Sequence, residues 1–469
     1  GDCGASGGGG GVRREPDTVS AQRRLIADNE LPALPTGWQV ERFRFLFRES
    51  KERNGPVPVG TMLSVSEYHG VTPKDYDHEE QRRTDAELET YRVVRPGQLA
   101  VNSMWLNHLG LGVSDHLGHI SPAYAAFDIS ERIDRRFAHH LLRSQLYLKI
   151  YLRYLYGIRP NSYQIKTNDW NSIPIIVPPV DTQKAIAAFL DRETARIDQL
   201  IEKKQRLVAL LGETRSNITT EVLYPLFGRI TWSVEDKAFR FIPQHSGGRV
   251  VRLKYLVQHM TSGARGWSDE VGDEGELFLQ SGNIGRRMQV DFSSAVRVKP
   301  QSGAEANRTA VRAQDVLVCI TGGRTGAVGF VETEPERSYI NQHVCLLRSN
   351  PQKILPRLLA QLLWSQIGQS QFSACQYGLK QGLGFSEVAN ILLPIPPFEQ
   401  QAALTQNILE RCQRVDQIER MTALSITRLQ EHRSALITAA VTGQIDVTRW
   451  SRYGEADRRL DQIQEELAG

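Results

Sequence analysis

The chain has 469 residues, of which 40% are hydrophobic and 23% charged, and its formal net charge is +4. This composition is that of an ordinary soluble protein with room for two to four domains. No apolar run is long enough to span a bilayer, and the five cysteines show no Cys-x-x-Cys spacing, which argues against a membrane span, a disulfide framework and a zinc site. We therefore expect a cytoplasmic protein, and we do not expect the small charge excess by itself to indicate a nucleic-acid partner.

The chain divides into six predicted segments. Residues 1–30 are Gly-rich and lack the apolar core of a signal peptide, so we interpret them as a flexible leader. Beyond them lie short runs rich in Val, Ile, Phe and Tyr, such as "GQLAVNSMW" and "DVLVCIT", followed by helical patterns. The predicted order is the leader (1–30), a first mixed domain (31–177), a long helix (178–228), a second mixed domain (229–395), a second long helix (396–446) and a charged C-terminal tail (447–469).

The second half of the chain repeats the first at an offset of 218 positions, measured from Pro178 to Pro396. The aligned features are Gln183 with Gln401, "RIDQ" at 196–199 with "RVDQ" at 414–417, "RFRFL" at 42–46 with "RLKYL" at 252–256, and "VRPGQLAV" at 94–101 with "VRAQDVLV" at 311–318. Matching blocks in the same order indicate two copies of one plan. The predicted fold class is α+β, with two similar mixed α/β domains separated by two long helices in a pseudo-twofold internal repeat.

Both long helical segments carry apolar residues at a seven-residue spacing, which keeps one seam facing a partner helix. We predict that they pack as an antiparallel coiled coil, each helix being about 40 residues and about 60 Å long. Lys204 and Thr422 lie at the centre of the two seams, where a polar residue either fixes the register or marks a solvent-facing turn. The predicted seam residues are Leu190, Ile197, Ile201, Val208, Leu211, Ile218, Ile408, Val415, Leu429 and Leu436.

A Pro-Pro pair stands at the start of each long helical segment, and a glutamine follows it after three intervening residues. Proline cannot continue the preceding strand and suits the first turn of a helix, so we interpret the motif as a helix start. Asp181 has the right residue type for the N-cap of the first long helix.

The motifs of common enzymes are missing. There is no Gly-x-x-x-x-Gly-Lys-Ser/Thr loop, and "TGGRTGAVG" at 321–329 lacks the lysine that would reach phosphates. "IPPF" at 395–398 has Ile395 where an amino-methyltransferase needs a polar residue, and His116-x-x-His119 has no third metal ligand at a suitable spacing. We therefore predict no catalytic residues, no metal site and no cofactor in this chain.

Several segments resemble one known family. They are "LPTGWQVERFRFL" at 34–46, "GLGVSDHLGHISPAY" at 110–124, "TGGRTGAVGF" at 321–330 with "YINQHVCLLR" at 339–348, and "GLKQGLGFSEVANILLPIPPFEQQ" at 378–401. Over about residues 31–450 the chain resembles the specificity (S) subunit of type I restriction–modification systems. One departure is "PPVDTQKAI" at 178–186, where the more usual form has Glu-Gln as at Glu399-Gln400.

The resemblance implies a division of labour between subunits. Two target recognition domains would each bind one half of a split double-stranded DNA sequence, and the helices would form the spacer and dock two methyltransferase (M) subunits. The M subunits would carry S-adenosylmethionine and methylate adenine. Restriction (R) subunits, where present, would add translocation and cleavage driven by ATP with Mg²⁺. The chain itself would be a DNA-binding subunit without activity of its own.

Candidate DNA-contacting residues come from polar loops, because Arg and Lys suit phosphates and guanine, whereas Asn and Gln suit adenine. They are Lys74, Tyr76, Arg82, Arg83, Asn107 and His108 in the first domain, and Arg265, Arg286, Arg287, Arg324 and Lys380 in the second. For the first set a solvated loop is an equally good explanation, and for Arg324 so is a tight hairpin turn between glycines. Two other functions stay open: a protein–protein adaptor with two binding modules, and a hydrolase with an unfamiliar arrangement of residues.

Overall fold

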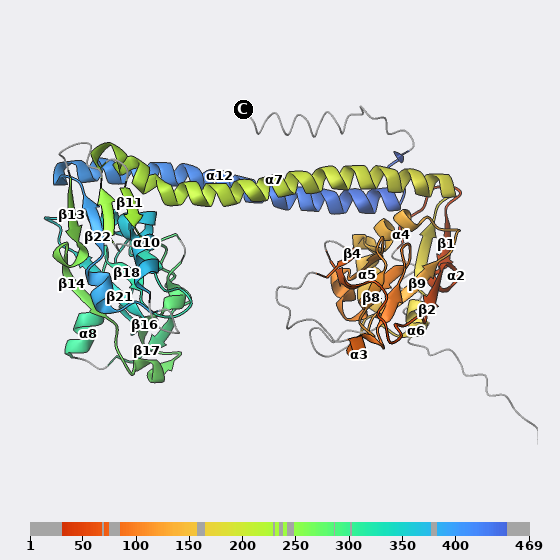
Figure 1. Cartoon of the computed structure of the whole chain (residues 1–469), viewed down its shortest axis with the longest axis horizontal. Coiled ribbons are helices and arrows are strands. Elements are labelled where there is room, and N and C mark those ends of the chain that lie inside the picture. Colours follow the sequence, from red (N-terminus) through yellow and green to blue (C-terminus); the bar gives the residue numbers. More distant parts are fainter. Residues whose placement is uncertain are drawn as a thin grey trace, which may run out of the picture. The chain divides into compact units, whose positions relative to one another are not determined.

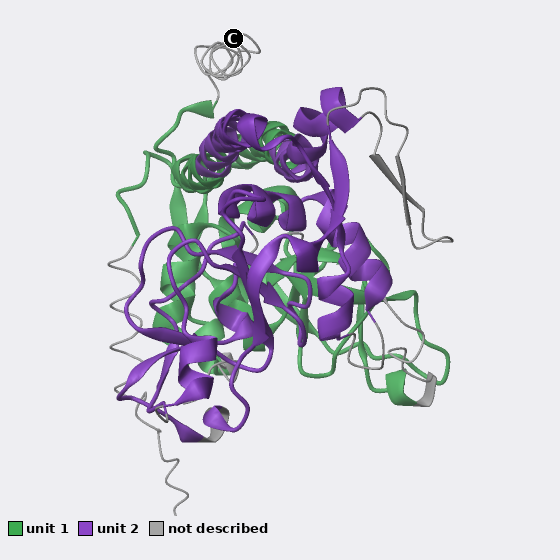
Figure 2. Cartoon of the chain, turned by 90° about the vertical axis from the view of Figure 1, so that its left-hand side faces the viewer, with its two compact units in different colours: residues 1–203, 425–469 green, residues 204–424 purple. Residues whose placement is uncertain are grey.

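The computed structural model describes residues 31–67, 70–74, 85–156, 165–227, 230–233, 238–241, 248–285, 287–300, 303–376 and 382–447 (Figure 1). The chain forms two compact units. Unit 1 comprises residues 1–203 and 425–469, and unit 2 comprises residues 204–424, so each unit contains part of both long helices (Figure 2). Among the described residues, no helix combines the length and the apolar character that crossing a membrane requires.

Unit 1 contains three small sheets. One has the strand order β2-β9-β6-β7, made of Phe47–Ser50, Ala125–Ile129, Leu99–Val101 and Leu111–Val113. The next has the order β4-β3-β8-β5, made of Gly70–Pro73, Thr61–Ser66, Gly118–Ile120 and Arg92–Val94. The last pairs β1 (Gln39–Arg42) with β10 (Pro174–Val177). The helices are α2 (Phe43–Leu46), α3 (Asp85–Leu88), the 3-10 helix η2 (Ser103–His108), α4 (Arg135–Leu142), α5 (Gln145–Tyr154) and α6 (Thr167–Trp170).

Unit 2 repeats this arrangement. Its first sheet, β14-β21-β18-β19, consists of Val257–Ser262, Val344–Ser349, Val316–Cys319 and Val328–Phe330. Its second, β15-β17-β16-β20, consists of Val271–Gly272, Val296–Val298, Glu276–Leu279 and Ser338–Ile340. Two pairs complete it: β13 (Arg249–Arg252) with β22 (Leu392–Ile395), and β11 (Ile230–Ser233) with β12 (Ala238–Phe241). The helices are η3 (Leu253–Tyr255), η4 (Trp267–Glu270), η5 (Ser281–Asn283), α8 (Ala304–Thr309), α9 (Pro356–Trp364), α10 (Gln366–Cys375) and α11 (Phe385–Ala389).

The two units also share features of strand pairing. In each second sheet one pair is parallel, β3 with β8 and β16 with β20, while the other pairs are antiparallel. In each unit a two-stranded antiparallel sheet joins a strand early in the mixed domain, β1 or β13, to the strand before a long helix, β10 or β22. The predicted α+β fold with two similar mixed domains is confirmed.

Each late helical pattern forms two helices rather than one. The break falls at Ser144 between α4 and α5, and at Ser365 between α9 and α10. In both cases the serine caps the second helix, since its side chain accepts a hydrogen bond from the backbone N–H of Tyr147 or Ile367. The hydrophobic spacing alone does not reveal this change of direction, because it continues across the serine.

The long helices are α7 (Val180–Phe227) and α12 (Phe398–Val441). In unit 1 the first part of α7 and the last part of α12 share a core with the mixed domain, through Leu190 and Ile437 among others. In unit 2 the last part of α7 and the first part of α12 do the same, through Ile218 and Ile408. The two helices therefore pack antiparallel, as predicted, and their apolar faces also complete the core of each domain.

The predicted seam residues differ in burial. Leu190, Ile197, Ile201, Ile218, Ile408 and Val415 are all less than 10% exposed, whereas Val208, Leu211, Leu429 and Leu436 are half-buried. Thr422 is 7% exposed and its hydroxyl donates to the Ile418 carbonyl of its own helix, 2.8 Å away. A solvent-facing turn is therefore wrong for Thr422, although Lys204 is half-exposed. Because α7 begins at Val180, Asp181 lies in the first turn of the helix and not at the N-cap. In the first turn its negative charge still interacts favourably with the helix dipole.

Candidate functional site

Two equivalent loops bring sequence-predicted residues to the same place in both units. Residues 102–110 join β6 to β7, and residues 320–327 join β18 to β19. Both strand pairs occupy the same end of their four-stranded sheets. The first loop contains Asn107 and His108, and the second contains Arg324. The fold thus makes these three candidates counterparts, in agreement with the aligned blocks 94–101 and 311–318 that precede the two loops.

The loop of unit 1 is anchored by buried residues and carries an exposed aromatic ring. Asn102 is buried; its amide oxygen accepts from the backbone N–H of Met104 at 3.2 Å, and its amide nitrogen donates to the Tyr124 hydroxyl at 2.8 Å. Leu106 is fully buried and anchors the middle of the loop. Above it, the side chain of Trp105 is 45% exposed.

Polar groups lie next to this ring. The centroids of the Trp105 and His108 rings are 5.1 Å apart. The amide oxygen of Asn107 is buried and has no hydrogen-bond partner within the described residues. An indole ring that water can reach, next to an imidazole, is suited to stacking and polar recognition. Trp105 was not among the residues predicted from the sequence; its place two residues before Asn107 was the available signal.

The loop of unit 2 is closed by its arginine. The Arg324 guanidinium Nη1 donates to the carbonyls of Gly282 and Ile284, at 2.9 and 2.7 Å. Gly322 and Gly326 have φ of +97° and +88°, a backbone region that favours glycine. The turn interpretation of this segment therefore holds, and Arg324 joins two loops while its side chain stays exposed.

The remaining candidates do not gather at these loops. Arg287 makes ion pairs with Asp416 and Glu419 of α12, so it links the second domain to a long helix. Arg265 and Lys74 are exposed in other loops. Tyr76, Arg82, Arg83, Arg286 and Lys380 lie outside the described residues.

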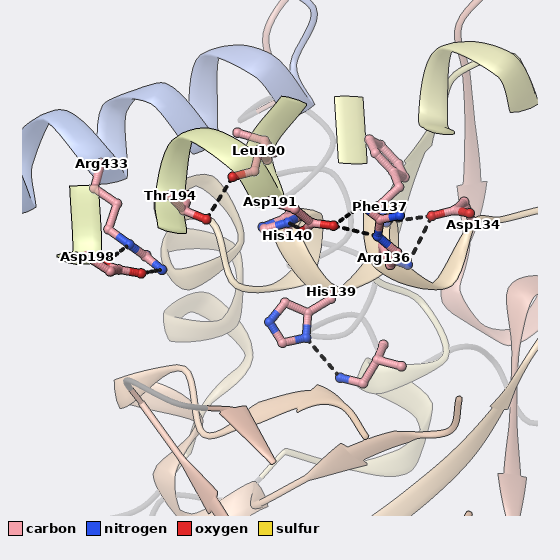
Figure 3. A network of polar contacts seen from close by, with 11 residues as sticks. Asp134, Arg136, Phe137, His139, His140, Leu190, Asp191, Thr194, Asp198 and Arg433 are labelled. Carbon is pink, nitrogen blue, oxygen red and sulfur yellow. Dashed lines mark hydrogen bonds and ion pairs between the residues drawn. The ribbon is translucent and has the colours of Figure 1, made fainter. Parts of the chain in front are cut away.

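The paired helices carry a repeated ion pair. In unit 1, Arg433 of α12 donates to Asp198 of α7 at 2.8 and 3.1 Å (Figure 3). In unit 2, Arg215 of α7 donates to Asp416 of α12 at 2.8 Å. Arg215 and Arg433 are 218 positions apart, and so are Asp198 and Asp416. The same ion pair therefore forms in both units, but α12 supplies the arginine in unit 1 and α7 supplies it in unit 2. The repeat therefore extends from sequence to individual contacts.

Unit 1 has a second polar network beside this ion pair. Figure 3 shows His140 and Arg136 of α4 directed at Asp191 of α7, with distances of 2.6 and 2.5 Å to its carboxylate oxygens. Burial would raise the pKa of Asp191, yet the hydrogen bonds and charges of His140 and Arg136 lower it overall. Burial lowers the pKa of the neighbouring His139 to about 3, so this ring is neutral and its Nδ1 accepts from the Val113 N–H at 3.2 Å. A cleft of about 990 Å³ opens beside the network.

Large apolar side chains are exposed on the helices of unit 2. Ile418, Met421 and Leu424 follow one another at three-residue spacing on α12 and are 47–58% exposed, and Leu207 and Leu210 of α7 are 41% and 50% exposed. The positions 218 residues away hold Leu200, Lys203, Arg206, Ser425 and Arg428. This apolar surface is therefore not duplicated in the repeat.

Metal-binding chemistry has little support. Within the described part of the chain no group of three or more His, Cys, Asp and Glu side chains is placed to hold a metal ion. His119 is 2% exposed and its Nδ1 is hydrogen-bonded to the Val59 carbonyl at 3.1 Å, while His116 is exposed in the preceding loop. Burial raises the pKa of the thiols of Cys319 and Cys345 to about 12, which makes both poor nucleophiles.

Two specificity subunits of type I restriction enzymes are similar to this chain in sequence. The specificity subunit of the type I restriction enzyme EcoKI from Escherichia coli (strain K12) is 20% identical over 314 residues, covering 66% of this chain and 65% of that protein. The specificity subunit of EcoBI from Escherichia coli is 22% identical over 338 residues, covering 67% and 66%. The chain thus spans slightly less than two thirds of the length of both relatives. No protein-family model matches it.

Solved structures share the fold. A chain from a study of complex assembly and conformational transition of the type I R-M system has a TM-score of 0.66 at 18% identity, covering 88% of this chain and 100% of that one. The HsdS subunit from Thermoanaerobacter tengcongensis has a TM-score of 0.51 at 17% identity, covering 88% and 99%. The chain is similar to type I specificity subunits. Both its sequence and its duplicated fold support that similarity, and the resemblance stated from the sequence is confirmed.

Proposed function

We propose that this chain is the DNA-binding specificity subunit of a type I restriction–modification complex and binds a bipartite target with a spacer of fixed length. The observation that carries the proposal is the duplicated domain, whose two copies end in equivalent loops and are each joined to both long helices. Two similar binding modules on a defined support suit two DNA segments a constant distance apart.

In this proposal residues 31–177 and 229–395 are the two target recognition domains, and each contacts one half-site. The loop with Trp105, Asn107 and His108 is the leading candidate for base contacts in the first domain. In the second, Arg324 shapes the equivalent loop, and Arg265 stays a candidate for phosphate contact. Arg287 has a helix-linking role instead, since two carboxylates of α12 hold it.

The outer faces of 182–222 and 400–440 would dock two methyltransferase subunits. The exposed apolar side chains of α7 and α12 in unit 2 support a protein partner there, because large apolar stripes on a surface commonly mark interfaces. In this proposal S-adenosylmethionine belongs to the methyltransferase subunits, ATP and Mg²⁺ belong to restriction subunits, and this chain is not catalytic. Its cellular place would be the cytoplasm.

The first test is co-expression of the full chain with a partner methyltransferase, followed by mapping of methyladenine in the host DNA. We expect methylation at one bipartite sequence and none when this chain is omitted. Binding of the complex to duplex DNA should weaken steeply with salt, since phosphate contacts release counterions. Salt-independent binding, or methylation that does not depend on this chain, would favour the adaptor function.

Two engineered changes test the modular picture. Insertion of seven residues into both long helices keeps the seam and adds about 10 Å, so the spacer should grow by roughly three base pairs with unchanged half-sites. Replacement of 31–175 by the segment of a related subunit should change one half-site only. New half-sites after the insertion, or an unaltered target after the replacement, would contradict the proposal.

A further inference from the structure

The glutamine of each Pro-Pro-x-x-x-Gln motif has a role beyond a helix start. Gln183 and Gln401 both have 0% exposure, although they lie in the first turn of a long helix. A buried amide needs hydrogen-bond partners for both its ends, and each of these side chains has them.

The two glutamines make the same set of bonds. Gln183 donates from Nε2 to the carbonyls of Pro178 and Arg132, at 2.8 and 3.2 Å, and its Oε1 accepts from the Asp134 N–H at 2.6 Å.

Gln401 repeats this in unit 2. It donates from Nε2 to the carbonyls of Pro396 and Lys353, at 3.2 and 3.1 Å, and its Oε1 accepts from the Leu355 N–H at 2.9 Å. Both glutamines therefore join three backbone groups from two separate segments.

Only glutamine fits this arrangement. Ionised glutamate has the length but cannot donate to two carbonyls, and asparagine is shorter by one methylene. Between the two loop groups that each glutamine contacts lies a buried isoleucine, Ile133 or Ile354, at 2% and 0% exposure. The flanking loop residues differ between the repeats, because the glutamine uses only their backbone atoms.

The bonded loop leads directly to the candidate recognition loops. Asp134 and Leu355 are the N-cap residues of α4 and α9. In turn α4 packs on β7 and α9 packs on β19, the strands that follow the loops 102–110 and 320–327. A continuous path therefore runs from each long helix, through its glutamine, to one short helix and one loop.

We infer that Gln183 and Gln401 are positioning residues that set the angle between each recognition domain and its long helix. Through this angle they determine which spacer lengths the complex accepts. The inference rests on the proposed function. It concerns geometry, not base identity, so the glutamines affect the tolerated spacing between half-sites and leave the preferred bases unchanged.

The test uses the full chain assembled with its methyltransferase subunit and the target found by methyladenine mapping. Methylation rates are measured on duplexes with the native spacer and with spacers one base pair shorter or longer. One base pair turns a half-site by about a tenth of a helical turn, so a rigid complex discriminates among these duplexes. We expect Gln183→Leu and Gln401→Leu to lower the ratio of native to altered rates at least tenfold, with the same preferred half-site bases.

The matched control is Gln145→Leu, at an exposed position of α5, outside both long helices and outside the candidate loops. It should keep the discrimination of the unmodified complex. An unchanged ratio in the Gln183→Leu and Gln401→Leu complexes would overturn the inference while leaving the proposed function intact. A lack of methylation of any bipartite target by the unmodified complex would overturn the proposed function instead.

A second measurement does not depend on the folding of any variant. Amide hydrogen exchange of the unmodified full chain reports on the N–H groups of Asp134 and Leu355, whose acceptors are the two glutamine side chains. We expect exchange at least a hundredfold slower than in the exposed loops. Exchange as fast as in those loops would show that the bonds do not persist, and the inference would then be wrong.

Discussion

The repeated ion pair of the long helices allows one contact to be tested in two surroundings. Arg215 and Arg433 occupy equivalent positions, and each holds an aspartate of the other helix. The side chain of Arg215 is only 7% exposed and lies 4.4 Å over the Trp364 ring, whereas that of Arg433 is 33% exposed and its partner Asp198 is 52% exposed. The same substitution should therefore have unequal effects.

The expected magnitudes follow from burial. For Arg433→Ala we expect a loss of about 0.5–1 kcal/mol, typical of a solvent-exposed pair. For Arg215→Ala we expect about 3 kcal/mol. Asp416 is 26% exposed and would keep Arg287 as its remaining ion-pair partner among the described residues, and the contact with the indole ring would be lost. For a domain of this size that corresponds to a fall in Tm of roughly 6–12 °C against about 1–4 °C.

The free energy of unfolding of the full chain is measured by calorimetry and by chemical denaturation. One double-mutant cycle combines Arg215→Ala with Asp416→Ala, and the other combines Arg433→Ala with Asp198→Ala. The coupling energy should be larger in the Arg215 cycle than in the Arg433 cycle. Equal losses for the two arginine variants, or a larger loss for Arg433→Ala, would refute the argument from burial.

Three further predictions concern single groups. The pKa of His139, about 3, lies below the usual value, so between these values the unfolded chain binds a proton that the folded chain does not. The free energy of unfolding should therefore fall as the pH drops from about 6.5 towards 3, by roughly 2 kcal/mol at pH 5. In urea titrations, His139→Asn should flatten this pH dependence. Arg348→Lys should cost about 1–3 kcal/mol of unfolding free energy, since Asp315 is fully buried and the arginine holds both its oxygens at 2.7 and 2.8 Å; a loss below 0.5 kcal/mol would count against this. Cys319 and Cys345 should resist alkylation in the native chain and react only after unfolding, and rapid native labelling of either would contradict their burial.

The sequence predicted only part of the candidate site. The loop around Asn107 and His108 was a candidate because of its polar residues. The aligned blocks 94–101 and 311–318 already relate it to the loop of Arg324, and the strand order of the two sheets agrees with this. Arg287 had the residue type of a DNA contact, yet two carboxylates more than a hundred positions later hold it. Residue type alone cannot distinguish an arginine that faces a ligand from one that faces its own chain.

The sequence by itself determined the duplication, the two long helices and their antiparallel pairing. These features depend on local spacing: seven-residue periodicity, proline before each helix, and matching blocks at one offset. Only the tertiary structure decided which polar side chains connect separate segments of the chain. Gln183 and Gln401 looked like ordinary first-turn residues, and they are instead buried bridges to loops about fifty positions earlier. The partners of these glutamines are backbone groups, and every residue type has a backbone carbonyl. The identity of the partner residues therefore carries no information about the contact, and a sequence pattern cannot predict it.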